Sequence, residues 1–253
     1  MADSKERFSN RVDKYVQYRP GYPEAAIDYL YGEVGFRPDS DIADIGAGTG
    51  IFSGLLVERG SRVVAVEPNA AMRRAAEEAL GGEPGFRAWD GSAEATGLPD
   101  ASVDFIACAQ AFHWFDRSAA HSEFRRILKP GGRAALVWNV RLLEGVPFLE
   151  AYERLLQTYG TDYAKVRHHH VSNESELAPF FKDGAIRVGR FANAQLFGFD
   201  GLRGRLESSS YCPLPGDARY EELMAELRRL FDAYQENGTV AFEYETKVYW
   251  GEL

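Results

Sequence analysis

Short apolar runs alternate with stretches of helical spacing along the first 140 residues, and this alternation predicts a parallel α/β sheet. The runs are continuous rather than alternating, which is typical of strands covered on both faces. We expect strands over 41–45, 62–66, 85–89, 103–108 and 133–140, and helices over 51–59, 70–80 and 117–128. Asn69 and Asp116 are suited to cap the last two helices. Strand-helix-strand units of this kind connect parallel neighbours.

The alternation ends after residue 140. Apolar residues between Phe148 and Tyr159 have helical spacing, so residues 141–183 are expected to form a helical cap over the strand ends. One or two strands are expected over 185–199, a short helix over 201–209, a helix from Tyr220 to Gly238, and an antiparallel edge strand over 240–250. Because no linker interrupts the pattern, residues 1–253 are predicted to form one domain with a cap.

The N-terminal residues 1–31 contain two helical stretches separated by a proline-rich turn. Apolar residues between Phe8 and Val16 have helical spacing, and a second helix is expected over 24–30. Two interpretations stay open: helices packed on the sheet, or a lid over a ligand with Arg19 facing a carboxylate. The candidate substrate residues of such a lid are Tyr18 and Tyr22.

Charge and composition narrow the range of partners. The formal net charge of −9 disfavours nucleic acid and anionic membranes, because both need a basic surface. No apolar run reaches the roughly 18 residues that span a membrane, and the charged first residues lack the apolar core of a secretory signal. Only two cysteines, Cys108 and Cys212, are present, so no disulfide framework is expected. We therefore predict a cytoplasmic protein; its oligomeric state is not indicated.

Residues 41–50 are the most informative segment: a buried strand, a glycine-rich turn and the start of a helix. Glycines at alternating positions let the backbone approach a ligand closely, and the helix N-terminus directs N–H groups toward it. A dinucleotide turn needs its third glycine where Ile51 stands, one position after Gly50. A carboxylate at Asp44 would repel a pyrophosphate and attract a sulfonium or ammonium group. The segment therefore favours S-adenosylmethionine over NAD.

An acidic residue ends the second expected strand. Glu67 stands where a carboxylate accepts hydrogen bonds from ribose hydroxyls, although a solvated glutamate is the alternative. This position indicates an adenosine cofactor without separating the two candidates.

Several short motifs follow one another in a fixed order. They are the tyrosine- and proline-rich run Tyr15 to Pro23, Asp-x-Gly-x-Gly-x-Gly at Asp44 to Gly50, Glu67-Pro68 with Met72, Gly91 to Glu94 with Leu98-Pro99, Val103-Asp104, and Gln110 to Phe115. In this order they resemble the class I S-adenosylmethionine-dependent methyltransferases, in particular the type 11, trans-aconitate-methyltransferase-like small-molecule branch. The resemblance covers residues 8 to about 140 well and the last strand weakly. It implies a Rossmann-like, doubly wound, mostly parallel seven-stranded sheet with an antiparallel last strand and a helical cap.

The resemblance also implies a set of cofactor-binding residues. They are Arg19, Asp44, Gly46, Ala47, Gly48, Glu67, Pro68, Met72, Ser92, Ala93 and Gln110. The glycine turn would lie along the methionine part, the glutamate would hold the ribose, and the residues after it would pack on adenine. Gln110 would accept from the methionine ammonium group and Arg19 would pair with its carboxylate. Many relatives carry aspartate at the adenine edge where Ser92 stands, so Asp90 or Glu94 would share that role.

The chemistry is an in-line displacement that needs a base only when the acceptor must lose a proton. His113 is the candidate catalytic base, and a structural histidine is the alternative. Its aromatic neighbours, including Trp114, are either core residues or a wall around the sulfonium or substrate. The further candidate substrate residues follow the fifth strand: Trp138, Asn139 and Arg141. Arg141 is either a ligand for a substrate carboxylate or a solvated side chain.

A metal centre is not expected. Adjacent residues on a helix point about 100° apart, so the run His168 to His170 is poorly suited to hold one ion. The sequence thus predicts S-adenosylmethionine-dependent methyl transfer to a small molecule, with O-methylation of a carboxylate or hydroxyl favoured. The alternatives are C- or N-methylation, an NAD-dependent oxidoreductase, and a cofactor-binding protein without catalysis.

Overall fold

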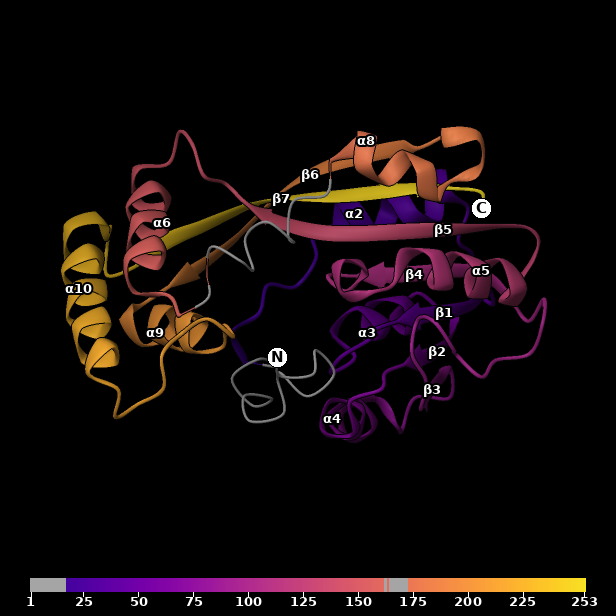
Figure 1. The fold of residues 1–253 in the computed structure, drawn as a ribbon, viewed down its shortest axis with the longest axis horizontal. Helices are drawn as coiled ribbons and strands as arrows, with labels where there is room; N and C mark the ends of the chain where they lie inside the picture. The colour runs from indigo at the N-terminus through magenta and orange to yellow at the C-terminus, as the bar shows by residue number, and fades with distance from the viewer. Residues whose placement is uncertain (1–16, 162, 164–172) are drawn as a thin grey trace.

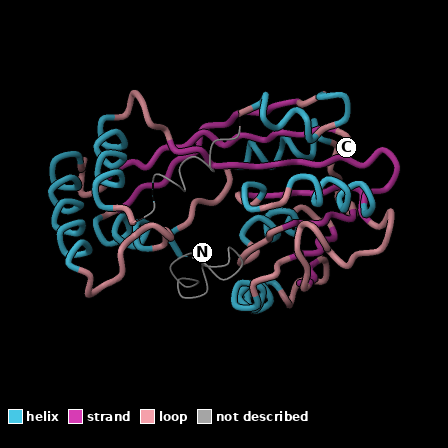
Figure 2. The backbone as a smooth tube through the Cα atoms, in the orientation of Figure 1, coloured by secondary structure: helices cyan, strands magenta, loops and turns pink. Residues whose placement is uncertain are grey.

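The computed structural model describes residues 17–161, 163 and 173–253, and its ribbon divides into two lobes joined by long strands (Figure 1). The larger lobe contains β1 to β4, and the smaller one contains α6, α9 and α10. Helices pack on the outside of the strands in both lobes (Figure 2). The helix expected between Phe8 and Val16 and the His168 to His170 run lie outside the described residues.

One seven-stranded sheet runs through the molecule in the order β3-β2-β1-β4-β5-β7-β6. Its strands are β1 (Asp41–Ile45), β2 (Arg62–Val66), β3 (Phe86–Trp89), β4 (Val103–Ala109), β5 (Leu128–Arg141), β6 (Arg187–Phe197) and β7 (Val240–Gly251). Strands β1 to β5 are parallel, and β7 is antiparallel to both of its neighbours. The predicted Rossmann-like, doubly wound sheet with an antiparallel last strand is therefore confirmed.

The expectation that the last strand lies at the edge of the sheet is wrong. β7 lies between β5 and β6, and β6 forms the edge. The burial patterns give the reason: the last four residues of β7 are all buried, whereas β6 alternates with exposed positions along most of its length. A single strand, β6, takes the place of the one or two expected over 185–199.

The described helices are α2 (Glu24–Tyr29), η1 (Leu30–Val34), α3 (Ile51–Glu58), α4 (Ala70–Leu80), η2 (Phe112–Trp114), α5 (Arg117–Ile127), α6 (Pro147–Tyr159), α8 (Glu174–Leu177), η3 (Ala178–Phe180), η4 (Lys182–Gly184), α9 (Phe199–Glu207) and α10 (Ala218–Tyr234). The two expected N-caps form: Asn69 accepts hydrogen bonds at the start of α4, and Asp116 does so at the start of α5. Helix α10 ends at Tyr234 rather than Gly238, because the chain turns there into a bridge between Glu236 and Thr239. Among the described helices, none is long and apolar enough to cross a membrane.

Three buried clusters explain the two lobes. In the larger lobe, α2, η1 and α3 cover one face of the sheet and α5 with η3 covers the other. A third cluster fills the smaller lobe, where α6, α9 and α10 pack around the far ends of β6 and β7. The segment 141–183 divides between them: α6 belongs to the smaller lobe, whereas Leu177 and Phe180 return to the core of the larger one.

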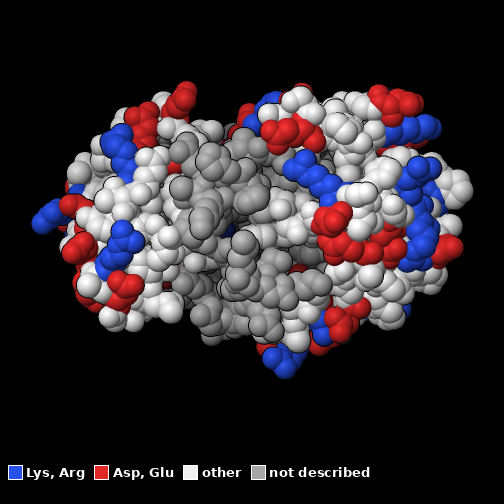
Figure 3. All heavy atoms as spheres, viewed as in Figure 1, with Lys and Arg blue, Asp and Glu red and all other residues white. Residues whose placement is uncertain are grey.

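The long strands connect these cores. β5 has 14 residues and β7 has 12, against five in β1 and in β2. At about 3.3 Å per residue, β5 and β7 extend well beyond β1 to β4 and carry the smaller lobe at their far ends (Figure 1). Acidic and basic side chains are interspersed on both lobes of the face drawn in Figure 3.

Candidate active site

A cavity of about 320 Å³ lies between the lobes, at the carboxyl ends of β1, β2 and β4. In the sheet order β1 and β4 are neighbours although they are not consecutive in the chain. Ligands of open α/β sheets bind at such a reversal of strand order, where the loops diverge to opposite faces. Residues of the smaller lobe, including Arg205 and Tyr244, close the opposite end of the cavity.

The glycine turn after β1 has the backbone that its sequence predicts. Gly46, Gly48 and Gly50 have φ angles of 71°, 58° and 81°, in the left-handed region that favours glycine. A Cβ atom on Gly46 would lie 2.6 Å from the Cβ of Ala111, so this residue also permits the close approach of the turn that follows β4. The same turn exposes Gly46, Ala47 and Gly48 to the cavity.

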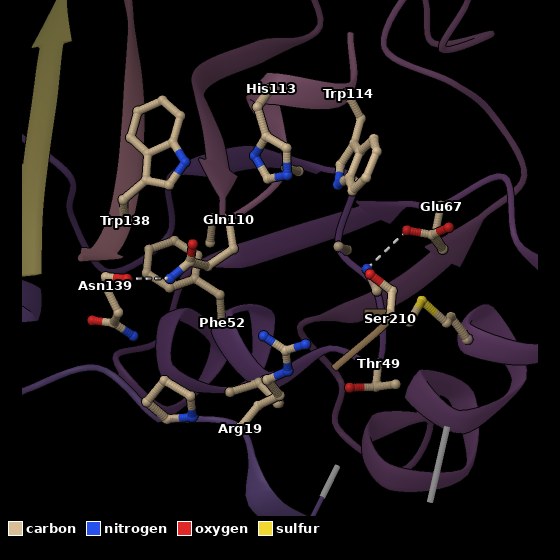
Figure 4. A pocket seen from close by; sticks show the side chains of 18 of the residues that line it. Arg19, Thr49, Phe52, Glu67, Gln110, His113, Trp114, Trp138, Asn139 and Ser210 are labelled. Carbon is tan, nitrogen blue, oxygen red and sulfur yellow. Dashed lines mark hydrogen bonds between the residues drawn. The ribbon is translucent and has the colours of Figure 1, made fainter. Parts of the chain in front are cut away.

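Glu67, at the end of β2, lines the cavity beside this turn. Its Oε2 accepts a hydrogen bond from the Gly48 amide at 2.9 Å, and one bond of Glu67 is drawn in Figure 4. Its Oε1 accepts a hydrogen bond from the Asn69 amide at 2.8 Å. Burial raises the pKa of Glu67, and these amide donors oppose the shift. The carboxylate thus ties the glycine turn to the start of α4 and keeps acceptor positions at the cavity wall.

Asp44 does not line the cavity, so its predicted contact with the cofactor is wrong. Successive side chains of a strand point to opposite faces, and this one points toward α3, where Oδ2 accepts from Ser53 Oγ at 2.6 Å. Burial raises the pKa of Asp44 to about 7, and the charge of Glu67 adds to the shift. Because such a carboxyl is partly neutral near pH 7, it carries less of the expected repulsion of a pyrophosphate.

Gln110 directly follows β4 with a φ angle of 58°, which is unusual for a residue with a side chain. The backbone N–H of Gln110 donates to Val137 O at 2.9 Å, and the side-chain Nε2 donates to Asn139 O at 3.3 Å. These bonds hold the strained turn and keep the Gln110 side chain at the cavity wall.

An aromatic wall stands above Gln110 (Figure 4). His113 lies between Trp138 and Trp114, and all three line the cavity. The rings of His113 and Trp114 are 4.7 Å apart. Within this aromatic run, Phe112 is fully buried core, whereas Trp114 and Phe115 line the cavity. Their contact with a sulfonium group or a substrate stays a prediction.

One part of the cavity wall is formed by four residues that are predicted to pack near adenine: Pro68, Met72, Ser92 and Ala93. Ser92 and Ala95 exchange backbone hydrogen bonds in a tight turn that fixes this wall. Of the two acidic residues expected to assist, Asp90 is exposed, bonds to Arg73 and does not line the cavity. Glu94 lines the cavity and accepts from the Asp116 amide at 3.0 Å.

The N-terminal segment crosses the cavity between the lobes. Arg19 and Tyr22 line the cavity, and Arg19 Nη2 donates to Ser208 O of the smaller lobe at 3.2 Å. Asn139 Nδ2 donates to Gly21 O at 3.0 Å, so the predicted substrate residue Asn139 also holds this segment in place. Tyr18 is not among the lining residues, contrary to its predicted role as a substrate residue; its ring packs against Gly204 on α9 instead.

Arg141 reaches the cavity from the end of β5 and is not the solvated side chain that one interpretation allowed. It is buried in an ion pair with Glu153 and donates a hydrogen bond to Tyr163 at 2.9 Å. Its positive charge is therefore compensated within the protein.

The sequence did not predict several of the lining residues, and six of them come from the smaller lobe: Leu143, Tyr163, Arg205, Ser210, Tyr211 and Tyr244. One signal was available for Arg205. It falls on the apolar face of its helix, three residues after Leu202 and next to Leu206, where a charged residue is unusual. The other residues carry no comparable local signal, because they reach the cavity only through the packing of the two lobes.

The family profile described as "Methyltransferase domain" matches residues 43–136, which include the glycine turn, Glu67 and β4. A methyltransferase-like protein of Schizosaccharomyces pombe is 32% identical over 222 residues, covering 87% of this chain and 84% of the relative. The chain belongs to the class I S-adenosylmethionine-dependent methyltransferases. An uncharacterised methyltransferase of Mycobacterium tuberculosis is 44% identical over 139 residues, which are 55% of this methyltransferase and 54% of the relative's length.

The fold of this methyltransferase also matches a solved structure. A protein of Anaeromyxobacter dehalogenans, described as a type II methyltransferase, superposes with a TM-score of 0.68 at 27% identity, covering 93% of this chain and 98% of that one. The match to the M. tuberculosis relative spans about half of that protein. Membership of the trans-aconitate-like branch stays a prediction.

Proposed function

We propose that the cavity binds S-adenosylmethionine and that the methyltransferase transfers its methyl group to a small molecule, with O-methylation of a carboxylate or hydroxyl favoured. The observation that carries the proposal is the pairing of the left-handed glycine turn with Glu67 at the carboxyl ends of β1 and β2. This arrangement offers close backbone approach and a ribose acceptor side by side.

The residues present fit this cofactor. A Cβ atom on Gly48 would point into the space beside Met72, where the cofactor's adenosine half would lie. Thr49 Oγ1 is buried at the cavity wall and has no hydrogen-bond partner among the described residues, so it is available to a bound ligand. In this assignment Gln110 accepts from the ammonium group and Arg19 pairs with the carboxylate of the methionine part.

The cofactor supplies a methyl group that is already activated by its sulfonium centre. The protein's contribution is to align the acceptor with that methyl group and to exclude water. The aromatic wall of Trp114 and Trp138 offers ring faces that attract a cation. His113, between these rings, is placed to take the proton of a hydroxyl acceptor, whereas an ionised carboxylate acceptor needs no base.

One further relative supports the choice of O-methylation. A malonyl-[acyl-carrier protein] O-methyltransferase of Methylococcus capsulatus is 42% identical over 101 residues, which are 39% of this chain and 37% of that protein. The match covers less than half of either protein, so the acceptor of this chain has to be identified by experiment.

Titration calorimetry tests the cofactor assignment. S-adenosylhomocysteine and S-adenosylmethionine are expected to bind, and NADH is not. Glu67→Gln should weaken S-adenosylhomocysteine binding about 10-fold or more. The glutamine side chain has one acceptor oxygen instead of two, so either a backbone N–H group of Gly48 or Asn69 or a ribose hydroxyl loses its acceptor. Glu58→Gln, an exposed change at the end of α3, is the matched control.

Three results would contradict parts of the proposal. Binding of NADH in preference to S-adenosylhomocysteine would indicate an oxidoreductase. Cofactor binding without methyl transfer to any member of an acid, alcohol and amine panel would indicate a protein that senses the cofactor. If methylated products form only at nitrogen or carbon atoms, N- or C-methylation would replace O-methylation as the reaction.

A further inference from the structure

The end of the cavity inside the smaller lobe contains a buried cation. Arg205 comes from α9, is 7% exposed and lines the cavity. It lies in the lobe opposite the glycine turn and Glu67, which form the proposed cofactor half of the cavity (Figure 1).

The hydrogen-bond partners of Arg205 within the described chain are neutral. Nε donates to the hydroxyl of Tyr244 at 3.3 Å, and Nη1 donates to Ser209 Oγ at 3.1 Å. The guanidinium group also lies 5.4 Å from the centre of the Phe242 ring. No described carboxylate forms an ion pair with Arg205, and its Nη2 has no described hydrogen-bond partner.

A second arginine at the same end shows the contrast. Arg141 is nearly as buried, but Glu153 neutralises it. Arg205, Arg141 and Glu153 together therefore carry one net positive charge in a buried site. Removing an ion from water costs several kcal/mol unless an opposite charge compensates it, so an unpaired buried arginine is expected where a ligand brings the missing charge.

We propose that Arg205 forms an anion subsite for the acceptor, and that the acceptor is an organic acid whose carboxylate binds there. The guanidinium fork suits the two oxygens of a carboxylate, and the hydroxyls of Ser210, Tyr211 and Tyr244 line the same space as further donors. One net positive charge matches a monoanion. A doubly charged phosphate ester would bring an extra negative charge that the described residues do not compensate.

This inference rests on the proposed function, because it assigns the acceptor half of the same cavity. The experiment therefore starts from protein saturated with S-adenosylhomocysteine. Binding of the monoanions acetate, propionate and benzoate is measured by calorimetry, with the matching neutral amides and with inorganic phosphate. The variants are Arg205→Met, Arg205→Lys and the control Arg203→Met, whose arginine is on the same helix but exposed beside Asp200.

We expect the unmodified protein and Arg203→Met to bind at least one of the carboxylates and none of the amides. Arg205→Met should bind that carboxylate about 30-fold more weakly or worse, because the pair loses its buried cation. Arg205→Lys should lie between them, since it keeps the charge without the fork. Without ligand, Arg205→Met should melt at the same temperature as the unmodified protein or higher.

Four results would overturn the subsite while leaving the proposed function intact. The first three are carboxylate binding by Arg205→Met as strong as that of the unmodified protein, no carboxylate binding by the unmodified protein, and stronger binding of phosphate than of any carboxylate. The fourth is loss of S-adenosylhomocysteine binding in Arg205→Met alone, which would assign Arg205 to the binding of the methyl donor. A melting temperature of Arg205→Met lower by more than about 5 °C, or failure to fold, would make Arg205 structural and also overturn it. Failure of the unmodified protein to bind S-adenosylhomocysteine would instead refute the proposed function.

Discussion

Buried ionisable side chains in this methyltransferase differ in how their charge is compensated. Glu67 accepts hydrogen bonds from two backbone amides, and Arg141 is paired with Glu153. Asp44 has the hydroxyl of Ser53 as its described side-chain partner, and burial raises its pKa to about 7. The first two are stable as ions, whereas Asp44 gains stability from binding a proton.

Asp44→Asn is expected to raise the free energy of unfolding at pH 8 and to raise it by less near pH 5. Because the pKa of Asp44 is raised in the folded protein, the stability from its proton is complete below its ordinary value of 3.8 and is lost as the pH rises through about 7. Over that window the loss is on the order of 4 kcal/mol. Asparagine keeps an acceptor for Ser53 and carries no charge.

Urea unfolding of both proteins at several pH values from 5 to 8 measures this effect. The difference in unfolding free energy should grow with pH. A difference that is the same at every pH would mean that Asp44 does not titrate in this range.

At the scale of elements, two turns form the floor of the cavity. The glycine turn after β1 and the turn at Gln110 after β4 touch where Gly46 meets Ala111. Each turn has a residue with a left-handed φ angle at the end of a parallel strand. Both segments therefore bend away from the sheet and leave the cavity between them. The site therefore depends on the relative position of β1 and β4, which are paired in parallel register.

Gly46→Ala should disturb both turns. The left-handed φ angle of 71° is unfavourable for alanine, and the new Cβ would lie 2.6 Å from that of Ala111. We expect a loss of about 1–3 kcal/mol of stability and weaker S-adenosylhomocysteine binding, measured by urea unfolding and calorimetry. Gly82→Ala is the control, because its Cβ would meet nothing within 4 Å. Cofactor binding at the original strength in Gly46→Ala would show that the turns can separate without cost to the site.

At the scale of the whole molecule, the cavity exists because two cores share the same strands. β5 and β7 run from the core of the larger lobe into that of the smaller one, and β6 pairs with β7 along its whole length. The N-terminal segment adds a second connection through Arg19 and Ser208. Shared strands of this kind predict that the lobes unfold together.

Phe242→Ala tests this cooperativity. Phe242 is fully buried in the smaller lobe, where its ring packs against Tyr152 and Tyr244, so its truncation should cost about 3–5 kcal/mol. The four tryptophans lie in the larger lobe or at the cavity, so their fluorescence reports on that part of the molecule. Fluorescence and far-ultraviolet circular dichroism should give one coincident urea transition. Two separate transitions would show that the smaller lobe unfolds on its own.

Local patterns in the sequence were sufficient to predict the first five strands, the helices between them, the two N-caps and the glycine turn with Glu67. These features depend on residues close together in the chain, because strand burial, capping and left-handed glycines are decided within a few positions. The order of motifs also identified the methyltransferase family that the comparisons show.

Only the tertiary structure decided which side chains reach the cavity. It turned Asp44 toward α3, placed β7 inside the sheet, paired Arg141 with Glu153 and brought Arg205 to the end of the cavity in the smaller lobe. Each outcome depends on contacts between segments far apart in the chain, and the same local pattern is compatible with either side chain orientation or strand position. The sequence by itself therefore determined the part of the cavity formed by the glycine turn and Glu67, and the packing of the two lobes decided the part to which the smaller lobe contributes.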